Sequence, residues 1–569
     1  MKKWCWVCLW TGSAFTYGEA PMPDPPGVLQ LASPVRHAIS VSGSFGELRH
    51  NHFHGGIDIR SGRGPGGDDI LASAPGYISK IDIDAENLGK SLYITHPNGF
   101  VTVYAHLDRF RADLAECIRQ EQFAQQKFQL SMEFDPEHFP VRAGDLVAYM
   151  GNSGSSRGKH LHFELRDPDG EEVWDPLLFG LPLADSRAPV FRNVKFTGYD
   201  SEGLVVSQKV LPASMVRKQP RIRVPGAWFT ISVDAADHTD HSGFITGIKT
   251  LRMEVDGTER YAFSAERWRR DETRYINAHV ESGRGGRSWA RFHRCYLLCG
   301  NRLGLYNTCS NAGFVAMDDT TGHRVDLFAG DACGNQAALS FSVEKAPFTA
   351  GQPRGCKGQC LYPDQELVLE GSHSQFAFRE GSVYDVVHCK LEEASVCAPG
   401  SYSPLAGVSP QGMSLHHPVI IRLKPGREIP ETLRSKCYVA QKSGKGFINS
   451  GGRWEGDWLV AESRSAGPFC IRVDTLAPNL QLLRPRRKSQ RLNALRFRLT
   501  DNVGAIREIP DLSYEAYIDE QWVLMEYDKK NRLIHHAFEE WLTSGQHSYR
   551  VVVRDPLGNE KTYRGNFVR

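Results

Sequence analysis

Two short segments of this sequence place histidine and aspartate at spacings suited to metal binding. In the first segment, His54 and Asp58 are four positions apart, and residues at even spacing share one face of an extended chain. His54, Gly56 and Asp58 then face together, while Ile57 and Ile59 point to a core. Gly56 has no side chain, so we expect it to leave space for an ion between the imidazole and the carboxylate.

The second segment places two histidines on one face of a predicted strand. Leu161, Phe163 and Leu165 form the apolar face, so His160 and His162 project from the other face. Neutral imidazole is the commonest metal ligand in proteins and an effective proton carrier. Two histidines on the open side of a strand therefore suit a cleft better than a core.

A third strand selects one more histidine by the same alternation. Between Phe100 and Leu107 the odd-numbered positions are apolar, which leaves Thr102, Tyr104 and His106 on the opposite face. A single histidine is more often structural than metal-binding. Here three strands, interpreted independently, each place polar side chains opposite an apolar face, and that agreement favours a shared site.

These segments, together with two glycine-containing ones, resemble the lysostaphin/LytM-type metallopeptidases. The resemblance covers about residues 34–180, under a third of the chain, and its motifs occur in the order typical of that family. In chain order they are Phe45-Gly46-Glu47, His54-x-x-x-Asp58, Tyr104-Ala105-His106-Leu107, Gly151-Asn152-Ser153-Gly154 and His160-Leu161-His162-Phe163-Glu164.

The resemblance implies a zinc-dependent endopeptidase that hydrolyses peptide cross-links of bacterial peptidoglycan. It implies that His54, Asp58 and His162 are the ligands of Zn2+ and that His106 and His160 are catalytic histidines. The implied fold is a small antiparallel β-sheet domain with a groove across the ligand-bearing face. Cross-links ending in D-alanyl-diaminopimelate are the expected substrate, with glycine bridges and ordinary proteins as alternatives.

Three protein ligands leave a fourth position on zinc for water, which is the arrangement of a catalytic site. Zinc lowers the pKa of that water toward about 7 and polarises the scissile carbonyl. We expect His160 to orient or deprotonate the water and His106 to donate to the oxyanion or the leaving amine, and the two roles can be exchanged. Glu164 is either a steering partner of one imidazole or a solvated carboxylate at the rim of the site.

Two other functions are compatible with the same residues. Two histidines and one carboxylate also bind iron in oxygenases, so ligand type alone does not fix the metal. Alternatively, the chain is a catalytically silent envelope scaffold or an activator of other cell-wall hydrolases, as in relatives that have lost ligands. No ligand position is substituted here, which favours an active enzyme.

A mainly β fold is predicted to position these residues. Asn98-Gly99 lies between two alternating runs, Ser91 to Thr95 and Phe100 to Leu107, and this is a strong hairpin signal. One helix interrupts the β pattern, because apolar residues recur at helical spacing from Phe110 to about Leu130. We interpret this helix as a packing insertion, beside the cleft, in an N-terminal antiparallel β-sheet metallopeptidase domain.

Short β patterns continue after Pro182 and contain a weak internal repeat. Asp185-Ser186-Arg187-Ala188-Pro189 corresponds to Asp474-Thr475-Leu476-Ala477-Pro478, and Asp331-Ala332-Cys333-Gly334-Asn335 corresponds to Asp555-Pro556-Leu557-Gly558-Asn559. Turns of this kind are common in immunoglobulin-like β-sandwich domains. The sequence therefore predicts a metallopeptidase domain at 34–182, immunoglobulin-like sandwiches at 188–345 and 476–569, and a β-rich domain at 346–474.

Composition limits the choice of partners. The 569 residues are 41% hydrophobic and 24% charged with a formal net charge of +2, which excludes a strongly basic nucleic-acid-binding chain and indicates several domains. No later segment approaches the roughly 18 apolar residues of a membrane span. We expect a peptidoglycan peptide substrate, no nucleic acid, no transmembrane span, and an envelope protein as a potential partner of the C-terminal β domains.

The N-terminus resembles an export signal. Lys2 and Lys3 precede the apolar run Trp4 to Trp10, and small residues follow up to Ala20. We therefore expect residues 1–20 to be a signal peptide and the protein to be exported to the periplasm or cell envelope. Most cysteines cluster between residues 295 and 470, and in an exported chain this favours disulfides, with Cys117 expected to stay unpaired.

Overall fold

The computed structural model describes residues 29–62, 68–282, 291–317, 321–349, 358–483, 492–506 and 512–569. Strands dominate these residues, so the mainly β class predicted from the sequence is confirmed. The expected signal peptide, residues 1–20, lies outside the described residues. Within the described ranges, no helix is long and apolar enough to cross a membrane.

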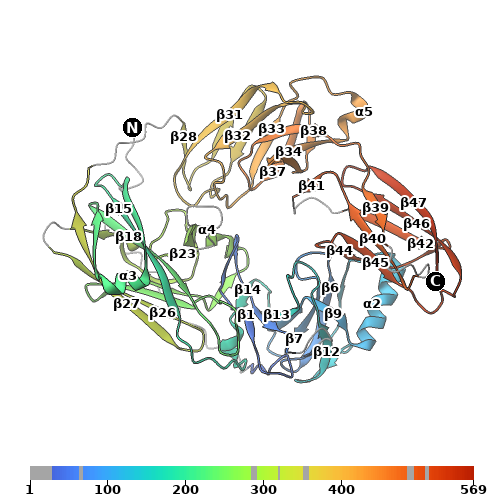
Figure 1. The fold of residues 1–569 in the computed structure, drawn as a ribbon, viewed down its shortest axis with the longest axis horizontal. Coiled ribbons are helices and arrows are strands. Elements are labelled where there is room, and N and C mark those ends of the chain that lie inside the picture. Colours follow the sequence, from blue (N-terminus) through green and yellow to red (C-terminus); the bar gives the residue numbers. More distant parts are fainter. Residues whose placement is uncertain are drawn as a thin grey trace. The chain divides into compact units, whose positions relative to one another are not determined.

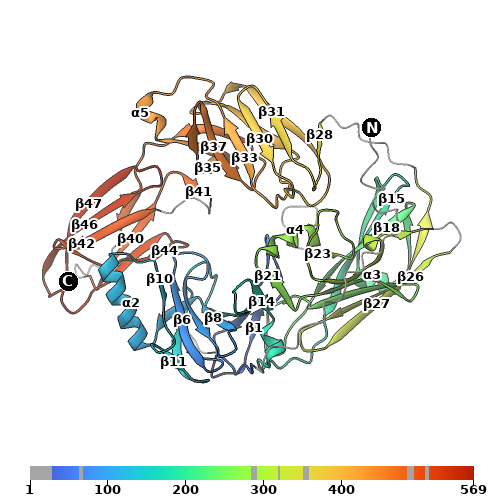
Figure 2. The same cartoon turned by 180° about the vertical axis from the view of Figure 1, so that it is seen from behind.

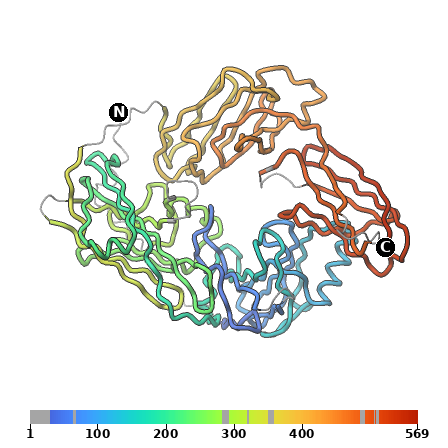
Figure 3. Tube along the Cα trace, viewed as in Figure 1, coloured from blue at the N-terminus to red at the C-terminus, as the bar shows by residue number. Residues whose placement is uncertain are grey.

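The protein consists of two compact units. One contains the chain up to Asp82, Leu88–Arg111 and Ser131–Gly355, and the other contains Ile83–Asn87, Ala112–Leu130 and Cys356–Arg569. Figure 3 lets the reader follow the chain through both units by colour, and Figure 1 and Figure 2 label the elements from opposite sides. All the predicted site residues belong to the first unit.

A large sheet of the first unit carries two of the predicted ligands, Asp58 and His162. Its strands, in spatial order, are β1 (Val41–Gly43), β4 (Ile57–Arg60), β13 (His160–Arg166), β8 (Val101–Ala105), β7 (Lys90–Thr95), β6 (Gly76–Ile83) and β10 (Leu130–Glu133), with β11 (Pro140–Val141) beside β6 and β14 (Glu172–Trp174) beside β13. A smaller sheet contains β5 (Asp69–Leu71), β12 (Leu146–Met150) and β9 (Leu107–Phe110), and β2 (Leu48–Arg49) pairs with β3 (His52–Phe53). The predicted hairpin is present as antiparallel β7 and β8, with Gly99 between them at φ 86°.

Strand β13 lies between the other two ligand-bearing segments. It pairs antiparallel with β4 and β8, and its register places His162 opposite Asp58 on one side and opposite Ala105 on the other. Leu161 and Phe163 are fully buried, as predicted. The opposite face of the strand is buried as well, since His162 is only 6% exposed. The expectation of an open strand face at the histidines is therefore wrong, because polar side chains pack there against one another.

The predicted helix is present but shorter than expected. Helix α2 spans Ala112–Gln125, and the chain leaves it at Gln126, whose φ of 52° is a common way to end a helix. Leu130, the expected end, instead begins β10. The helix belongs to the second unit, where Phe123 packs edge-on against Trp522 with ring centres 5.2 Å apart. Its contacts are thus those of a packing element.

The rest of the first unit is a pair of six-stranded sheets. One contains β16 (Val205–Pro212), β15 (Val190–Tyr199), β18 (Trp228–Ala236), β23 (Arg291–Arg294), β22 (Val280–Ser282) and β25 (Val315–Ala316); the other contains β17 (Arg221–Pro225), β27 (Gln336–Ala346), β26 (His323–Gly330), β19 (Thr250–Val255), β20 (Thr258–Ser264) and β24 (Tyr306–Cys309). Short helical segments are η1 (Pro176–Phe179), α3 (Ala213–Lys218), η2 (Glu272–Tyr275), α4 (Ile276–His279) and η3 (Ser310–Gly313), and β21 (Arg267–Arg269) joins the large sheet through β14.

The second unit contains four further sheets. The first sheet contains β28 (Gln359–Leu361), β31 (Val387–Cys397), β32 (Pro404–Ser409), β38 (Phe469–Val473), β34 (Cys437–Ser443), β35 (Gly446–Asn449) and β41 (Gly504–Ala505). The second sheet contains β29 (Leu367–Glu370), β30 (Ser374–Phe378), β33 (Val419–Leu423), β37 (Trp458–Ser463) and β36 (Arg453–Glu455). The short helix α5 spans Glu431–Arg434. The C-terminal two are β39 (Asn479–Leu482), β40 (Ala494–Thr500), β45 (Leu533–Ala537) and β44 (Glu526–Asp528), and β43 (Gln521–Trp522), β42 (Ser513–Ile518), β46 (Gln546–Arg554) and β47 (Glu560–Val568).

The described residues do not show the disulfides expected for the buried members of the cysteine cluster. Cys117 and the fully buried Cys295 and Cys389 are free thiols. Burial raises the pKa of Cys295 and, in the same way, raises the pKa of Cys389 to about 11. These side chains therefore act as small apolar core groups, and clustering along the sequence did not bring them into pairs.

Gly56 allows the chain before β4 to approach β13 closely. A Cβ at this position would lie 2.4 Å from the Phe163 carbonyl oxygen and 2.9 Å from Glu164 Cγ. The expectation that Gly56 leaves room for an ion is therefore wrong, since the missing side chain makes room for the neighbouring backbone. His54 reaches the site from a segment that precedes β4 rather than from within that strand.

Gly56→Ala is predicted to destabilise the first unit by about 1–3 kcal/mol, because a backbone oxygen must move to admit the methyl group. Calorimetric unfolding of the full chain measures this loss. Gly243→Ala is the matched control, because a Cβ at Gly243 meets nothing within 4 Å. Equal stability of the two variants would contradict the packing role assigned to Gly56.

Candidate metal centre

His54, Asp58 and His162 direct one atom each toward a common point. His54 Nε2 lies 3.0 Å from His162 Nδ1, His162 Nδ1 lies 2.9 Å from Asp58 Oδ1, and His54 Nε2 lies 3.1 Å from Asp58 Oδ1. The three side chains are buried, with residue exposures of 1%, 5% and 6% in chain order. The structure thus brings together the three ligands predicted from the sequence.

The hydrogen bonds around the two imidazoles fix which nitrogen carries a proton. His54 Nδ1 lies 2.8 Å from the Ser44 carbonyl oxygen, which can only accept, so His54 Nδ1 is the donor. His162 Nε2 lies 2.7 Å from Glu164 Oε1, and a carboxylate likewise accepts. The remaining nitrogens, His54 Nε2 and His162 Nδ1, then offer lone pairs to the common point.

This donor set fits a divalent cation. Two nitrogen lone pairs and a carboxylate oxygen within about 3 Å repel one another unless positive charge lies between them. Two imidazoles and one carboxylate are ordinary zinc ligands, and ligands of a tetrahedral zinc lie about 3.3 Å apart. The observed separations therefore need only small outward shifts to admit the ion.

Without an ion, a proton supplies the positive charge. Burial lowers the pKa of His54 to about 4, so this imidazole is neutral. Burial also acts to lower the pKa of His162, but hydrogen bonds to Asp58 and Glu164 outweigh it and raise that pKa to about 9. Burial acts to raise the pKa of Asp58, yet His54, His160 and His162 together hold it well below its usual range. The Asp58 carboxylate is thus charged and ready to bind a cation.

Glu164 is part of the centre rather than its rim. It is 7% exposed, and its second oxygen accepts hydrogen bonds of 2.8 and 2.6 Å from Nε and Nη2 of Arg166. Burial acts to raise the pKa of Glu164, but the charge of Arg166 and the hydrogen bond from His162 lower it far below the usual value. The solvated-rim alternative is therefore wrong, and Glu164 orients the His162 ring.

His106 and His160 lie beside this group. His106 Nδ1 donates to the Ser153 carbonyl oxygen at 2.9 Å and His160 Nδ1 to the Gly158 carbonyl oxygen at 2.8 Å, so in the neutral form of each ring Nε2 carries the lone pair. The two ring centres are 4.9 Å apart, and His160 Nε2 is 3.4 Å from Asp58 Oδ1. Burial, then the neighbouring His162 and His160, lower the pKa of His106 to about 3. His106 is therefore a neutral proton acceptor at neutral pH.

The prediction that His106 shares an open strand face with Tyr104 is wrong. Tyr104, expected on the same open face, is fully buried, and its hydroxyl accepts a hydrogen bond from the Ser73 N–H. His106 follows β8 and has a φ of 61°, so it leaves the alternation of the strand. This left-handed backbone turns the imidazole toward His160.

Two other histidines, expected to be decoys, are outside the centre. His50 and His52 are exposed at the β2–β3 turn, whereas His54 is buried. The loop between Gly151 and Gly158 has a direct role in the site, because its carbonyl oxygens orient the rings of His106 and His160. Backbone acceptors leave no mark in a sequence, so only the glycine-rich composition pointed to this loop.

Two arginines at the centre were not predicted. Arg49 donates to Asp58 Oδ2 at 2.5 Å, which leaves Oδ1 for a cation. Gly43 permits this contact, because a Cβ there would lie 2.4 Å from Arg49 Nη2. Arg166 continues the face of β13 that carries His162 and Glu164, so extending the alternation by two residues would have found it.

These features are those of a metallopeptidase in which Asp58 and His162 lie on neighbouring strands and His54 on the segment that leads into the first of them. Comparison with known families agrees. Residues 52–126 match peptidase family M23, and residues 358–474 match the Zu5-like domain. The chain therefore carries an M23 peptidase domain. The M23 match includes His54, Asp58 and His106, while the geometry adds His160 and His162.

Relatives with known names match the same part of the chain. The DD-carboxypeptidase/endopeptidase Mpg of Neisseria meningitidis serogroup B (strain ATCC 13091 / M2091) is 31% identical over 150 residues, which cover 26% of this chain and 28% of that protein. An uncharacterized metalloprotease of Haemophilus influenzae is 24% identical over 159 residues, covering 27% and 28%. The chain thus matches less than a third of the length of these relatives.

Solved structures give similar local matches. The catalytic domain of the prophage-encoded M23 protein EnpA from Enterococcus faecalis is 26% identical, covers 25% of this chain and 91% of that one, and has a TM-score of 0.19. The catalytic domain of lysostaphin from Staphylococcus simulans is 18% identical with the same coverage and the same TM-score.

Glu164→Gln is predicted to weaken zinc binding about 10- to 100-fold, because the neutral amide no longer fixes the His162 ring as a carboxylate does. Competition with a chromophoric chelator measures the affinity. Glu133→Gln, which changes an exposed carboxylate on β10, is the control. If both variants bind zinc as the unsubstituted chain does, Glu164 has no part in orienting His162.

Proposed function

We propose that this protein is a zinc-dependent endopeptidase that hydrolyses peptide cross-links of bacterial peptidoglycan. The observation that carries the proposal is the convergence of His54 Nε2, Asp58 Oδ1 and His162 Nδ1 within 2.9–3.1 Å, with two further imidazoles beside them. Three ligands leave a position for water or substrate, which distinguishes a catalytic zinc site from a structural one.

The acid–base chemistry belongs to His106 and His160. When bound, zinc acidifies water and polarises a carbonyl group. His106 Nε2 and His160 Nε2 are both acceptors, so either imidazole can take the proton from the attacking water. The imidazole that has gained a proton can then deliver it to the leaving amine. The Ser153 and Gly158 carbonyls hold both rings in the required tautomer throughout.

The name of one relative supports the proposed substrate class. Mpg is named a DD-carboxypeptidase/endopeptidase, an activity on D-amino-acid peptides, and we extend that class to this chain. Cross-links ending in D-alanyl-diaminopimelate are the proposed substrate, and export to the periplasm or envelope is the proposed location. A catalytically silent scaffold is disfavoured, because His54, Asp58, His162, His106 and His160 are all present and oriented.

Removal of a ligand is predicted to abolish cleavage. Purified sacculi incubated with the zinc-loaded full chain should release fragments with new amine and carboxyl ends, detected by mass spectrometry, and His162→Ala should release none. His138→Ala is the control, since His138 is exposed and distant in sequence from every ligand. The same fragments from the His162→Ala protein would refute the site.

The same assay separates the alternatives. Activity restored to a chelated sample by zinc, without oxygen or an oxo-acid, excludes an iron oxygenase. A chain that binds zinc stoichiometrically but cleaves no peptide bond in sacculi is instead a scaffold or an activator.

Single substitution of either catalytic candidate is predicted to leave zinc in place and to slow cleavage. His106→Ala and His160→Ala should each lower kcat about 10²- to 10⁴-fold, the range for loss of a positioned acid or base. Metal analysis and cleavage rates are measured on the same samples. Retained activity in one variant would remove that histidine from the mechanism, and lost zinc would make it a ligand.

A further inference from the structure

Each of the two copies of the internal repeat brings three aspartates together. Asp185, Asp237 and Asp331 in the first unit have carboxylate oxygens within 4.8 Å of one another. Asp474, Asp501 and Asp555 in the second unit do the same. The first set is called the Asp237 cluster and the second the Asp501 cluster.

The clusters occupy equivalent places in the two pairs of sheets. Asp237 directly follows β18 and Asp501 directly follows β40, while Asp331 directly follows β26 and Asp555 directly follows β46. Asp185 precedes β15, which pairs with β18, and Asp474 precedes β39, which pairs with β40. The sequence repeat noted above therefore reflects a repeated three-dimensional arrangement.

One hydrogen-bond framework holds the Asp237 cluster. Asp331 Oδ1 accepts from the backbone N–H groups of Cys333 and Asn335, and the Asn335 side chain donates to Asp331 Oδ2. The same Asn335 amide donates to the Asp185 carbonyl oxygen at 3.2 Å. Asp185 Oδ1 accepts from the Arg187 N–H.

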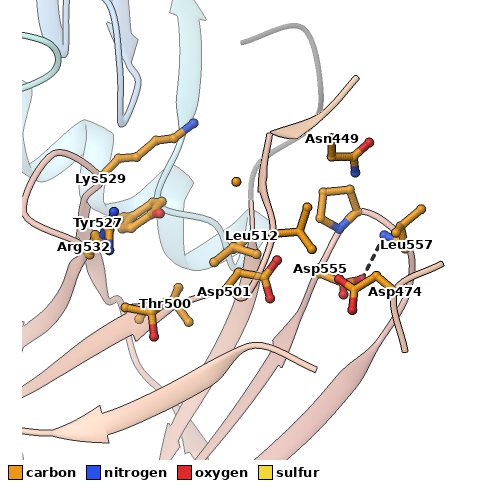
Figure 4. Close-up of a pocket in the computed structure, with 14 residues that line it drawn as sticks. Asn449, Asp474, Thr500, Asp501, Leu512, Tyr527, Lys529, Arg532, Asp555 and Leu557 are labelled. Atoms are coloured by element: carbon orange, nitrogen blue, oxygen red, sulfur yellow. Dashed lines mark hydrogen bonds between the residues drawn. The ribbon is translucent and has the colours of Figure 1, made fainter. Parts of the chain in front are cut away.

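The Asp501 cluster repeats these hydrogen bonds; the further donor to the first aspartate differs, being the Asp240 N–H at Asp185 and the Asn502 side chain at Asp474. Asp555 Oδ1 accepts from the backbone N–H groups of Leu557 and Asn559, and the Asn559 side chain donates to Asp555 Oδ2. That amide also donates to the Asp474 carbonyl oxygen at 3.0 Å, and Asp474 Oδ1 accepts from the Leu476 N–H. Figure 4 shows the Asp474, Asp501 and Asp555 carboxylates close together at the edge of a cavity of about 250 Å³.

The third aspartate of each cluster has one buried oxygen without a hydrogen-bond partner among the described residues. Asp237 is 3% exposed, and its Oδ1 is buried with no hydrogen-bond partner among the described residues. Asp501 Oδ1 is likewise buried and unpartnered in the described part of the chain. Buried carboxylate oxygens are rarely unsatisfied, and an unseen ion is one of the usual reasons.

The negative charges of the aspartates in each cluster also favour a bound cation. The charged groups that act on Asp237 and on Asp501 include the other two aspartates of the same cluster. Burial, and then the nearby Asp331 and Asp185, raise the pKa of Asp237 to about 6. Burial, and then Asp474 and Asp555, raise the pKa of Asp501 to about 6 as well. Three carboxylates at this distance repel one another unless something positive lies among them.

We propose that the Asp237 cluster binds a calcium ion and that the Asp501 cluster is a second copy of the same site. Each offers only oxygen atoms, which are the ligands of hard divalent cations. Magnesium keeps most of its waters and is usually held by one or two carboxylates, whereas calcium takes six to eight oxygen ligands. Three carboxylates on separate segments therefore suit calcium better.

The ion would hold the start of each sandwich to its sheets. Asp185 lies in the segment between the large sheet and β15, and Asp474 lies between β38 and β39. In each case the bound ion would join this connecting segment to two loops that follow strands. Calcium would therefore stiffen the entry to each sandwich, independently of the peptidase chemistry.

Calcium uptake by the full zinc-loaded chain tests the proposal. After removal of calcium with EGTA, isothermal titration with CaCl2 should show two ions per chain, and saturating calcium should raise Tm by about 4 °C or more. Asp237→Asn and Asp501→Asn should each lose one ion, and the double variant both. MgCl2 should bind more weakly, and the zinc content should stay constant in every sample.

The control is Asp200→Asn in the first sandwich. Asp200 is 2% exposed and accepts backbone bonds from Glu202 and Leu204 as Asp331 does, but it lies outside the cluster. It should keep both ions. In EGTA, Asp237→Asn should be as stable as the unsubstituted chain or more stable, because one repelling charge is gone, whereas a purely structural aspartate would lower Tm with or without calcium.

Three outcomes would overturn the assignment: no calcium uptake, equal uptake by Asp237→Asn and Asp200→Asn, or a lower Tm of Asp237→Asn in EGTA. Uptake of a single ion that Asp237→Asn abolishes would support the first site and refute the second.

Discussion

Three electron-rich atoms held about 3 Å apart are the constraint on which the first unit depends. His54 Nε2, Asp58 Oδ1 and His162 Nδ1 repel one another, so each is fixed by a partner that does not itself face the metal position. Ser44 holds His54, Arg49 holds Asp58, and Glu164 holds His162. The three donor atoms are therefore oriented before any ion binds, and a cation takes the place of the His162 proton that otherwise supplies the positive charge.

Residues that follow the predicted peptidase region also help to hold this segment. The Ser44 hydroxyl accepts a hydrogen bond of 3.0 Å from the Gly247 N–H, while the Ser44 carbonyl accepts from His54. Phe45, the next residue, packs against Trp268 with ring centres 4.2 Å apart, and Trp268 lies on β21, which joins the large sheet through β14. The segment that orients His54 is thus held by two residues far along the chain, Gly247 and Trp268. This part of the first unit therefore has a structural role at the metal centre.

The sequence pointed to the five central residues because metal ligands and proton carriers are chemically distinctive side chains, although the strand alternation used to select His106 does not hold. The sequence could not predict that both faces of β13 are buried. Apolar residues indicate that one face is packed, but polar residues on the other face do not show whether that face is buried or exposed. The carbonyl groups of Ser44, Ser153 and Gly158 have no signature in a sequence, although they set the tautomers of three histidines. The disulfide prediction failed for a related reason, because proximity along the chain does not determine proximity in space.

Donor chemistry keeps the two kinds of metal position separate within one chain. The His54–Asp58–His162 group offers two nitrogens, which calcium rarely uses, so calcium has little affinity for it. The Asp237 and Asp501 clusters offer oxygen alone and no imidazole or thiolate, the ligands that give zinc sites their affinity. The His54–Asp58–His162 group therefore favours zinc, and the Asp237 and Asp501 clusters favour calcium. The two kinds of site can bind different ions in the same solution.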